Sequence, residues 1–275
     1  MSDRPDLVRH YGGHGFVGRL DDVLTKAGLG GKRLSPNDLA PLDQFHARGL
    51  AATAELAEAV DILSHELSID IGPGLGGPSR YLATTYGCRV TGVDLSPTFV
   101  EAATYLAERA ELSHKVDYRC TDALALPFED ESFDVGWIQH VAMNIADRNG
   151  LYAEVFRVLR PGGRFAIYDV VAQQGMDVIF PVPWSPTPKT SFLLTAEDML
   201  TALLQRGFRT SSWIDRSDAA IEWFDEQRMA RAHGAPPTLG IHLAMGPDFP
   251  EMAANLERNL QEGRVGLVQA IMRRP

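Results

Sequence analysis

The chain has 275 residues and a formal net charge of −10; 45% of its residues are hydrophobic and 23% are charged. These values are ordinary for a globular protein with a sizeable core. The negative charge, without any Lys/Arg run, argues against nucleic acid as a partner. No stretch approaches the ~20 apolar residues of a membrane span, and no apolar signal-peptide core is found near the N-terminus. We therefore expect a cytoplasmic protein without a membrane partner, with Cys88 and Cys120 as isolated, reduced thiols.

The N-terminal region is predicted to be an arm that precedes the main domain. Residues 1–42 are polar and glycine-rich and predict an arm or lid with one short helix over 16–27. Residues 43–65 are rich in alanine with leucines at helical spacing, which predicts the first long helix, with Gly49 inside it or at a bend. We expect residues 43–275 to form one domain.

From residue 67 onward, short β-branched runs alternate with helical patterns. Strands are predicted over 67–71, 89–94, 116–120, 133–138, 164–171, 208–215 and 265–272. Helices are predicted over 78–86, 96–110, 150–159, 195–206, 218–232 and 251–261. Ser96 and Thr195 are expected N-caps, and the Pro-Gly-Gly run at 161–163 is expected to stop the helix over 150–159. Such alternation predicts an α/β fold with a seven-stranded, mostly parallel sheet and helices on both faces.

Two segments are long enough to close a pocket over this sheet. The loop over 172–190 holds four prolines around Trp184, which predicts a rigid wall rather than a plain connection. Some fifty residues separate the sixth and seventh strands, and we expect a helical cap there, over about 218–262.

A glycine-rich turn follows the first strand and carries the first ligand signal. Gly72, Gly74 and Gly77 satisfy G-x-G-x-x-G, the weak fingerprint of dinucleotide binding. The same turn also reads Asp70-x-Gly72-x-Gly74-x-Gly76, which resembles the S-adenosylmethionine loop of class I methyltransferases. Glycines let the backbone turn sharply and let a ligand come close, so the turn alone leaves both interpretations open.

Acidic residues at the next two strand ends extend this signal. Asp94 ends the second strand, where a carboxylate accepts hydrogen bonds from ribose hydroxyls in either interpretation. Asp122 follows the third strand, and the runs 126–134 and 157–163 come after it. A nicotinamide cofactor would gain nothing from Asp122, and no Tyr-x-x-x-Lys pair follows, so a dehydrogenase is disfavoured.

The glycine-rich turn, the strand end at Asp94, the stretch from Asp122 through 134 and the run 157–163 are four motifs in register. Over residues 69–169, and weakly to 272, they resemble the small-molecule class I methyltransferases (methyltransferase type 11). Residues 69–82, 137–140 and 166–169 carry a likeness to the sarcosine/dimethylglycine and sterol-like branch. The resemblance implies a Rossmann-like fold and a methyltransferase activity (EC 2.1.1.-). It also implies S-adenosyl-L-methionine as the cofactor, with S-adenosyl-L-homocysteine as its product.

By this resemblance, the cofactor would lie across the carboxyl ends of the first four strands. Asp70 would lie near its methionine amino group, Asp94 would hold the ribose and Asp122 would bond the exocyclic amine of the adenine. The full set of expected cofactor contacts is Asp70, Gly72, Gly74, Gly76, Asp94, Leu95, Asp122, Ala123, Gln139 and, from the N-terminal arm, Tyr11. No metal is expected.

Methyl transfer from a sulfonium is an in-line displacement, which a closed pocket and correct alignment accelerate. A base is needed only for an acceptor that arrives protonated, and His140, beside the expected methyl group, is the candidate. The other candidates to line the acceptor pocket are His46, Arg48, Asn144, Trp184 and His242.

Two acceptor classes stay open. Arg48 could hold the carboxylate of an amino acid, whereas an apolar acceptor would prefer the set Trp184, Trp213, Trp223, Phe224 and Met245. The sequence also leaves open the methylated atom (N, O or C) and the choice between a monomer and a homodimer. The alternative function is a non-catalytic S-adenosylmethionine-binding protein, or a methyltransferase-like fold recruited for a reaction such as cyclisation.

Overall fold

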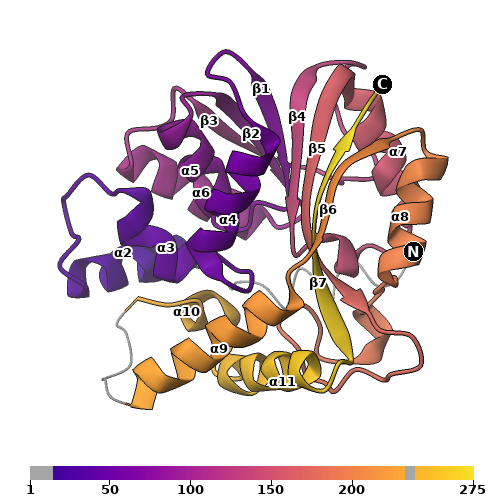
Figure 1. Cartoon of the computed structure of the whole chain (residues 1–275). Coiled ribbons are helices and arrows are strands. Elements are labelled where there is room, and N and C mark those ends of the chain that lie inside the picture. The colour runs from indigo at the N-terminus through magenta and orange to yellow at the C-terminus, as the bar shows by residue number, and fades with distance from the viewer. Residues whose placement is uncertain (1–14, 233–238) are drawn as a thin grey trace.

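A computed structural model describes residues 15–232 and 239–275 and shows one seven-stranded sheet (Figure 1). The strand order is β3-β2-β1-β4-β5-β7-β6. Neighbouring strands are parallel except for β7, which is antiparallel to both β5 and β6. The strands are β1 (Leu67–Ile71), β2 (Arg89–Asp94), β3 (Val116–Cys120), β4 (Phe133–Gln139), β5 (Leu159–Ala172), β6 (Arg209–Asp215) and β7 (Val265–Arg273). The predicted α/β, Rossmann-like fold class is confirmed.

Helices flank the sheet on two sides (Figure 1). The first side carries α4 (Gly49–Val60), α5 (Gly77–Thr85) and α6 (Pro97–Arg109). The opposite side carries α7 (Arg148–Val158) and α8 (Ala196–Gln205).

Three helices between β6 and β7 gather at one end of the sheet: α9 (Ser217–Ala232), α10 (His242–Met245) and α11 (Phe249–Gln261). The N-terminal arm contains α2 (Phe16–Lys26) and α3 (Pro36–Asp43), and α2 packs on α6. Both the arm and the cap of the predicted fold class are therefore present.

Local sequence signals explain where several helices begin. The Ser96 hydroxyl accepts a hydrogen bond from the Phe99 amide at 3.3 Å, and the Thr195 hydroxyl accepts one from the Asp198 amide at 3.1 Å. Each satisfies an amide that would otherwise lack a partner at the helix start. Both predicted N-caps are confirmed.

The long helix expected within 43–65 is present as α4, but its predicted extent is wrong, and Gly49 marks the bend that was one of the two alternatives. The chain instead forms α3, leaves helical conformation over 44–48 and begins α4 at Gly49. Arg48 and Gly49 have φ of 68° and 49°, so the backbone reverses there and buries Gln44 and His46 between the two helices. Alanine-rich composition favoured a continuous helix, but tertiary burial of these polar side chains prevails.

Two further boundaries differ from expectation. Helix α7 ends at Val158, and β5 begins at Leu159, so the Pro-Gly-Gly run lies inside the strand and does not stop the helix. Between the helices predicted over 218–232 and 251–261, residues 242–245 form an additional short helix, α10.

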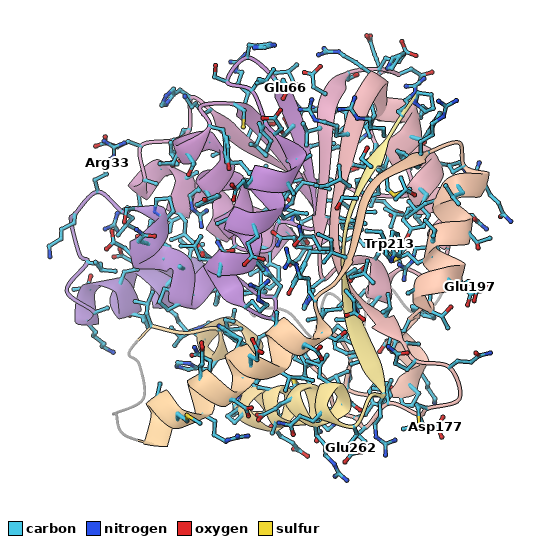
Figure 2. All side chains as sticks on the ribbon, in the orientation of Figure 1. Arg33, Glu66, Asp177, Glu197, Trp213 and Glu262 are labelled. Carbon is cyan, nitrogen blue, oxygen red and sulfur yellow. The ribbon has the colours of Figure 1, made fainter. Side chains whose placement is uncertain are left out.

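Apolar side chains fill both sides of the sheet. Trp137 and Tyr168 are fully buried on the side of α4, and Val155 and Phe165 on the side of α7. Exposed charged side chains such as Arg33 and Glu197 project from the periphery (Figure 2). No helix of the described ranges, 15–232 and 239–275, is long and apolar enough to cross a membrane.

Candidate active site

A cavity of about 800 Å³ opens where β1, β2 and β4 end. Its walls come from four parts of the chain: the strand ends, the turn before α4, the proline-rich loop after β5, and the cap. The strand-end wall includes the predicted residues Asp70, Gly72, Gly74, Asp94, Leu95, Asp122, Ala123, Gln139 and His140. The structure therefore brings together residues that are 70 positions apart in the sequence.

Asp70 lies at the floor of this cavity and is 2% exposed. Its carboxylate accepts a hydrogen bond from the Ser79 hydroxyl at 2.5 Å. Burial raises the pKa of Asp70 to about 7, the Ser79 hydroxyl lowers it, and the negative charge of Asp94 raises it further. The apoprotein thus holds a buried acid that is hydrogen-bonded to a serine and forms no ion pair with a described basic side chain, as expected of a group that meets a cationic ligand.

Asp94 shapes the glycine-rich turn from the end of β2. One of its carboxylate oxygens accepts the Gly74 amide at 3.2 Å and the other accepts the Ser96 amide at 2.8 Å. Burial raises the pKa of Asp94 to about 6, against the effect of these amides. Asp94 therefore connects the turn to the start of α6.

The backbone of the turn can only be made with glycine at its first position. Gly72 has φ of 69°, and a Cβ there would lie 2.5 Å from a methyl carbon of Val141. Gly74 also has positive φ and lines the cavity. Gly76, an expected cofactor contact, does not line it: it caps α5 with φ of 78° and its carbonyl accepts the Tyr118 hydroxyl at 3.3 Å.

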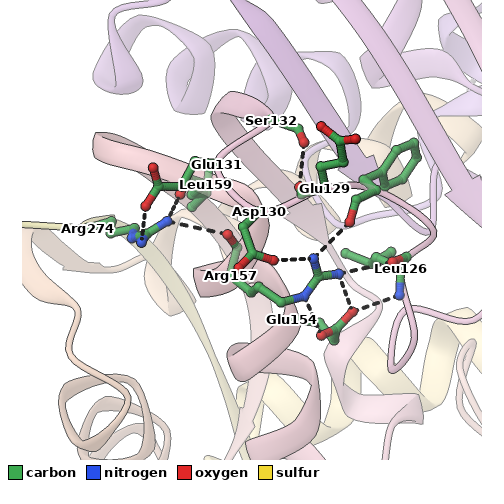
Figure 3. A network of polar contacts seen from close by, with 10 residues as sticks. Leu126, Glu129, Asp130, Glu131, Ser132, Glu154, Arg157, Leu159 and Arg274 are labelled. Atoms are coloured by element: carbon green, nitrogen blue, oxygen red, sulfur yellow. Dashed lines mark hydrogen bonds and ion pairs between the residues drawn. The ribbon is translucent and has the colours of Figure 1, made fainter.

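The loop that carries Asp122 and Ala123 is held by Arg157 of α7 (Figure 3). The guanidinium donates to the Leu126 and Phe128 carbonyls at 3.0 and 2.8 Å, and it pairs with Asp130 and Glu154. Those carboxylates raise the pKa of Arg157. The run 157–163, which contributed to the resemblance, thus acts on the cavity indirectly, by fixing the loop after β3.

A polar network joins Gln139 to the turn before α4. The indole N–H of Trp137 donates to Gln139 Oε1 at 2.9 Å, which directs the Gln139 amide nitrogen toward His46 Nε2, 3.2 Å away. The Thr53 hydroxyl lies 2.6 Å from Gln44 Oε1 and 3.0 Å from His46 Nε2. Burial lowers the pKa of His46 to about 4, so this ring is neutral at neutral pH.

His140 follows β4 directly and lies in a strained backbone conformation, with φ of 52°. Its ring stacks on Tyr168, with centroids 5.4 Å apart and an interplanar angle of 3°, and it contacts His46 edge-on. The Nε2 atom is buried and has no hydrogen-bond partner. Burial, then the neighbouring His46, lowers the pKa of His140 well below its usual value. A neutral imidazole therefore borders the cavity.

Two predicted pocket residues are placed elsewhere. Arg48 does not line the cavity, because its guanidinium makes two hydrogen bonds to Glu55, at 2.8 and 2.5 Å. His242 is exposed and borders a separate groove beside α2. Tyr11 lies outside the described residues. His46, Asn144 and Trp184 line the cavity as predicted.

The apolar candidates divide in the same way. Met245 of the cap lines the cavity. Trp213 of β6 packs against the core on the side of α7 and α8 (Figure 2), and Trp223 and Phe224 pack on the α4 side. The sequence reasoning missed Phe45, Phe192, Ile241 and Phe249, which also line the cavity. Only Phe192 had a usable signal, since it follows the proline-rich loop.

A buried ion pair, which the sequence did not predict, packs beside the glycine-rich turn after β1. Arg80 and Asp43 are each 1% exposed and 2.6 Å apart. Arg80 also donates to the Leu75 carbonyl at 2.7 Å, and Asp43 borders the cavity. Over residues 15–232 and 239–275, no group of three or more His, Cys, Asp or Glu side chains could hold a metal ion.

Comparison with known proteins agrees with this geometry. Residues 69–167 match the family of the methyltransferase domain. This part of the chain is a class I methyltransferase domain. Methyltransferase GfsG of Streptomyces halstedii is 34% identical over 140 residues, which are 51% of this chain and 50% of that protein. The chain thus matches about half of the length of this curated relative.

Solved structures extend the likeness to the whole chain. The crystal structure of the [4+2]-cyclase SpnF is 25% identical, with a TM-score of 0.68 over 94% of this chain and 95% of that one. Geranyl diphosphate C-methyltransferase from Streptomyces coelicolor is 17% identical, with a TM-score of 0.72 over 100% and 99% of the two chains. The second likeness concerns the fold, including the arm and the cap around the methyltransferase domain.

Proposed function

We propose that this protein transfers a methyl group from S-adenosylmethionine to a small-molecule acceptor inside the cavity. The carrying observation is that three acids, at the ends of β1 and β2 and just after β3, open into one cavity beside a glycine turn. Packing gives no common reason for three carboxylates there, whereas the cofactor offers an ammonium group, ribose hydroxyls and an exocyclic amine.

The residues present fit this cofactor. Gly72 and Gly74 both have positive φ and border the cavity, so the turn presents backbone without a side chain where the cofactor would lie. Asp70, buried without a basic partner, would hold the ammonium group, Asp94 the ribose, and Asp122 with Ala123 the adenine. When bound, S-adenosylmethionine supplies an activated methyl group. S-adenosylhomocysteine, the product, would occupy the same contacts.

The chain's own contribution is alignment, exclusion of water and control of one proton. Apolar residues of the cap and of the proline-rich loop border the cavity and restrict water. Burial lowers the pKa of His140, so its imidazole is neutral at neutral pH, and its Nε2 atom has no hydrogen-bond partner among the described residues and could accept a proton or a hydrogen bond from the acceptor. Gln139, fixed by Trp137 and His46, borders the same region.

The test has two stages. Calorimetric titration with S-adenosylhomocysteine should show binding by the wild type and a loss of about 2 kcal/mol for Asp94→Ala, because a charged hydrogen-bond partner is removed. Asp117→Ala, which removes an exposed β3 carboxylate outside the cavity, is the matched control and should bind normally. Equal binding by all three proteins would refute the ribose assignment.

The second stage measures transfer of labelled methyl to a panel of amines, phenols and sterol-like alcohols. A methylated product confirms the proposal. A second candidate function, a reaction such as cyclisation on the same scaffold, is favoured by the likeness to the solved [4+2]-cyclase. Cofactor binding without any methylated product across the panel would support that candidate instead.

We also propose a cellular setting and a partner class for this activity. The thiols of Cys88 and Cys120 are unpaired, which supports a cytoplasmic location. The net charge of −10 supports a small molecule rather than nucleic acid as the partner. Either a monomer or a homodimer fits the described site, since all of its walls come from one chain.

A further inference from the structure

The charged residues around the cavity are of one sign. Five aspartates border it: Asp43, Asp70, Asp94, Asp122 and Asp147. No lysine or arginine among the described residues does so. The two histidines on its wall, His46 and His140, have pKa values lowered by burial and add no positive charge at neutral pH.

Four arginines lie within two residues of a wall residue in the sequence. Arg119 is half exposed and is paired with Asp117 at 3.2 Å, and the other three are largely buried and engaged with other groups. Arg48 is paired with Glu55, and Arg80 with Asp43. Arg148 is 7% exposed, donates to the Phe192 carbonyl at 3.0 Å and faces Asp169 at 3.9 Å. Each of these three guanidinium groups is thereby directed into the protein, and none of the four borders the cavity.

The part of the wall that comes from the cap and the segment after β5 is apolar. It is formed by Trp184, Phe192, Ile241, Met245 and Phe249, whereas the other polar lining residues include Gln139, Asn144 and the two histidines. Two polar groups of the lining are already used in part: the Asn144 amide donates to the Trp184 carbonyl at 2.6 Å, and the Asp147 carboxylate caps α7 through the Gly150 amide. An anion placed against this apolar wall would lose its hydration without gaining a cationic partner.

We infer that the acceptor is a largely hydrocarbon molecule without an anionic group, and that the site discriminates against carboxylates, phosphates and diphosphates. This inference rests on the proposed function, because it concerns the molecule that would be methylated. The preference of the apolar wall for ligands without negative charge can nevertheless be measured by binding alone, without turnover. It also resolves the choice between the two acceptor classes, because Arg48 is not available to a carboxylate.

The test uses three naphthalene probes of equal size, with S-adenosylhomocysteine present at saturation. 1-Naphthylmethanol is neutral, 1-naphthoate is an anion and 1-naphthylmethylamine is a cation at neutral pH. Binding is followed by the fluorescence of Trp184, which is 3% exposed and borders the cavity, and by calorimetry. We expect 1-naphthylmethanol to bind at least tenfold more tightly than 1-naphthoate, which corresponds to about 1.4 kcal/mol. Equal or tighter binding of the anion would overturn the inference.

Matched variants place a cation inside or outside the cavity. Met245→Lys introduces an ammonium group at the acceptor wall and should raise the affinity for 1-naphthoate at least tenfold while it weakens 1-naphthylmethanol. Met229→Lys makes the same substitution at a side chain that is 64% exposed on α9 and should change neither affinity. Unaltered probe selectivity in Met245→Lys would contradict the assignment of this wall.

The two proposals fail separately. Titration with S-adenosylhomocysteine alone decides whether the cofactor binds and is read before any probe is added. If the cofactor does not bind but neutral probes are still preferred, the function falls and the charge selectivity stands. If the cofactor binds and the anion is preferred, the inference on the acceptor falls and the function stands.

Discussion

Asp70 is expected to destabilise the apoprotein at neutral pH. In the unfolded chain this carboxyl ionises near its ordinary pKa of 3.8, whereas in the folded protein burial raises the pKa to about 7. Between these values the folded state holds a proton that the unfolded state has released. The stability attributable to this group is therefore complete below pH 4 and declines as the pH rises toward 7.

The size of the effect follows from the two pKa values. A difference of about 3 pKa units corresponds to about 4 kcal/mol above pH 7. Replacing Asp70 by Asn keeps an oxygen that can accept the Ser79 hydroxyl and removes the titration. The difference in unfolding free energy between Asp70→Asn and the wild type should therefore increase, in favour of the variant, by about 2 to 3 kcal/mol from pH 5 to pH 7.

Urea unfolding at pH 5, 6, 7 and 8, followed by circular dichroism, measures this difference. Ser79→Ala supplies an independent check, because the Ser79 hydroxyl lowers the pKa of Asp70 and its removal should carry the decline to higher pH. If the gap between Asp70→Asn and the wild type is constant from pH 5 to pH 8, burial of an ionisable Asp70 is refuted. Asp70→Asn should also bind S-adenosylhomocysteine more weakly, so the gain in stability is opposed by a loss of ligand affinity.

Three other predictions concern residues around the turn. Arg80→Met should lower the free energy of unfolding, measured in urea, by about 3 to 5 kcal/mol, because buried Asp43 loses its partner. Adding Asp43→Asn should restore much of this free energy. A double variant as unstable as Arg80→Met would contradict the pairing. Gly72→Ala should lower the free energy of unfolding by about 2 to 4 kcal/mol, because residue 72 has a left-handed backbone and its Cβ would collide with Val141. Gly162→Ala, also at positive φ but with open space at its Cβ, should lower it by only about 1 kcal/mol. Equal losses of stability would show that the collision is not the reason. His140→Asn should reduce the rate of methyl transfer to a protonated acceptor by about 100-fold or more, with the dissociation constant of S-adenosylhomocysteine unchanged; an unchanged rate would exclude His140 as the base.

Much of the fold could be predicted because its signals are local. Alternating β-branched and helical runs marked all seven strands within about two residues except β5, which begins five residues earlier than expected. Ser96 and Thr195 marked helix starts through caps that involve only three further residues. The division of 43–65 into two helices was not predictable in this way, because burial of Gln44 and His46 against Gln139 and Thr53 is a long-range effect.

The same contrast holds for the site. Strand-end residues such as Asp94 and Gln139 were predicted because parallel strands bring their carboxyl ends to one edge. Arg48 was misplaced although its partner is local, because Glu55, seven residues on in α4, holds its guanidinium. His242 was misplaced because α10 places it at a separate groove beside α2. Phe249 and Ile241 of the cap could not be recognised, since an apolar residue in a helix gives the same signal whether it faces a core or a cavity.

The antiparallel direction of β7 has a consequence for how such a protein can be altered. Because β6 and β7 are hydrogen-bonded neighbours, the intervening segment leaves the sheet and returns to it at almost the same place. Closing a longer or shorter loop there costs little, about 0.6 kcal/mol for each doubling of length. Chain connectivity therefore sets little limit on the length of this segment, which supplies Ile241, Met245 and Phe249 to the cavity wall, whereas the strand ends that carry the three acids lie elsewhere in the sheet.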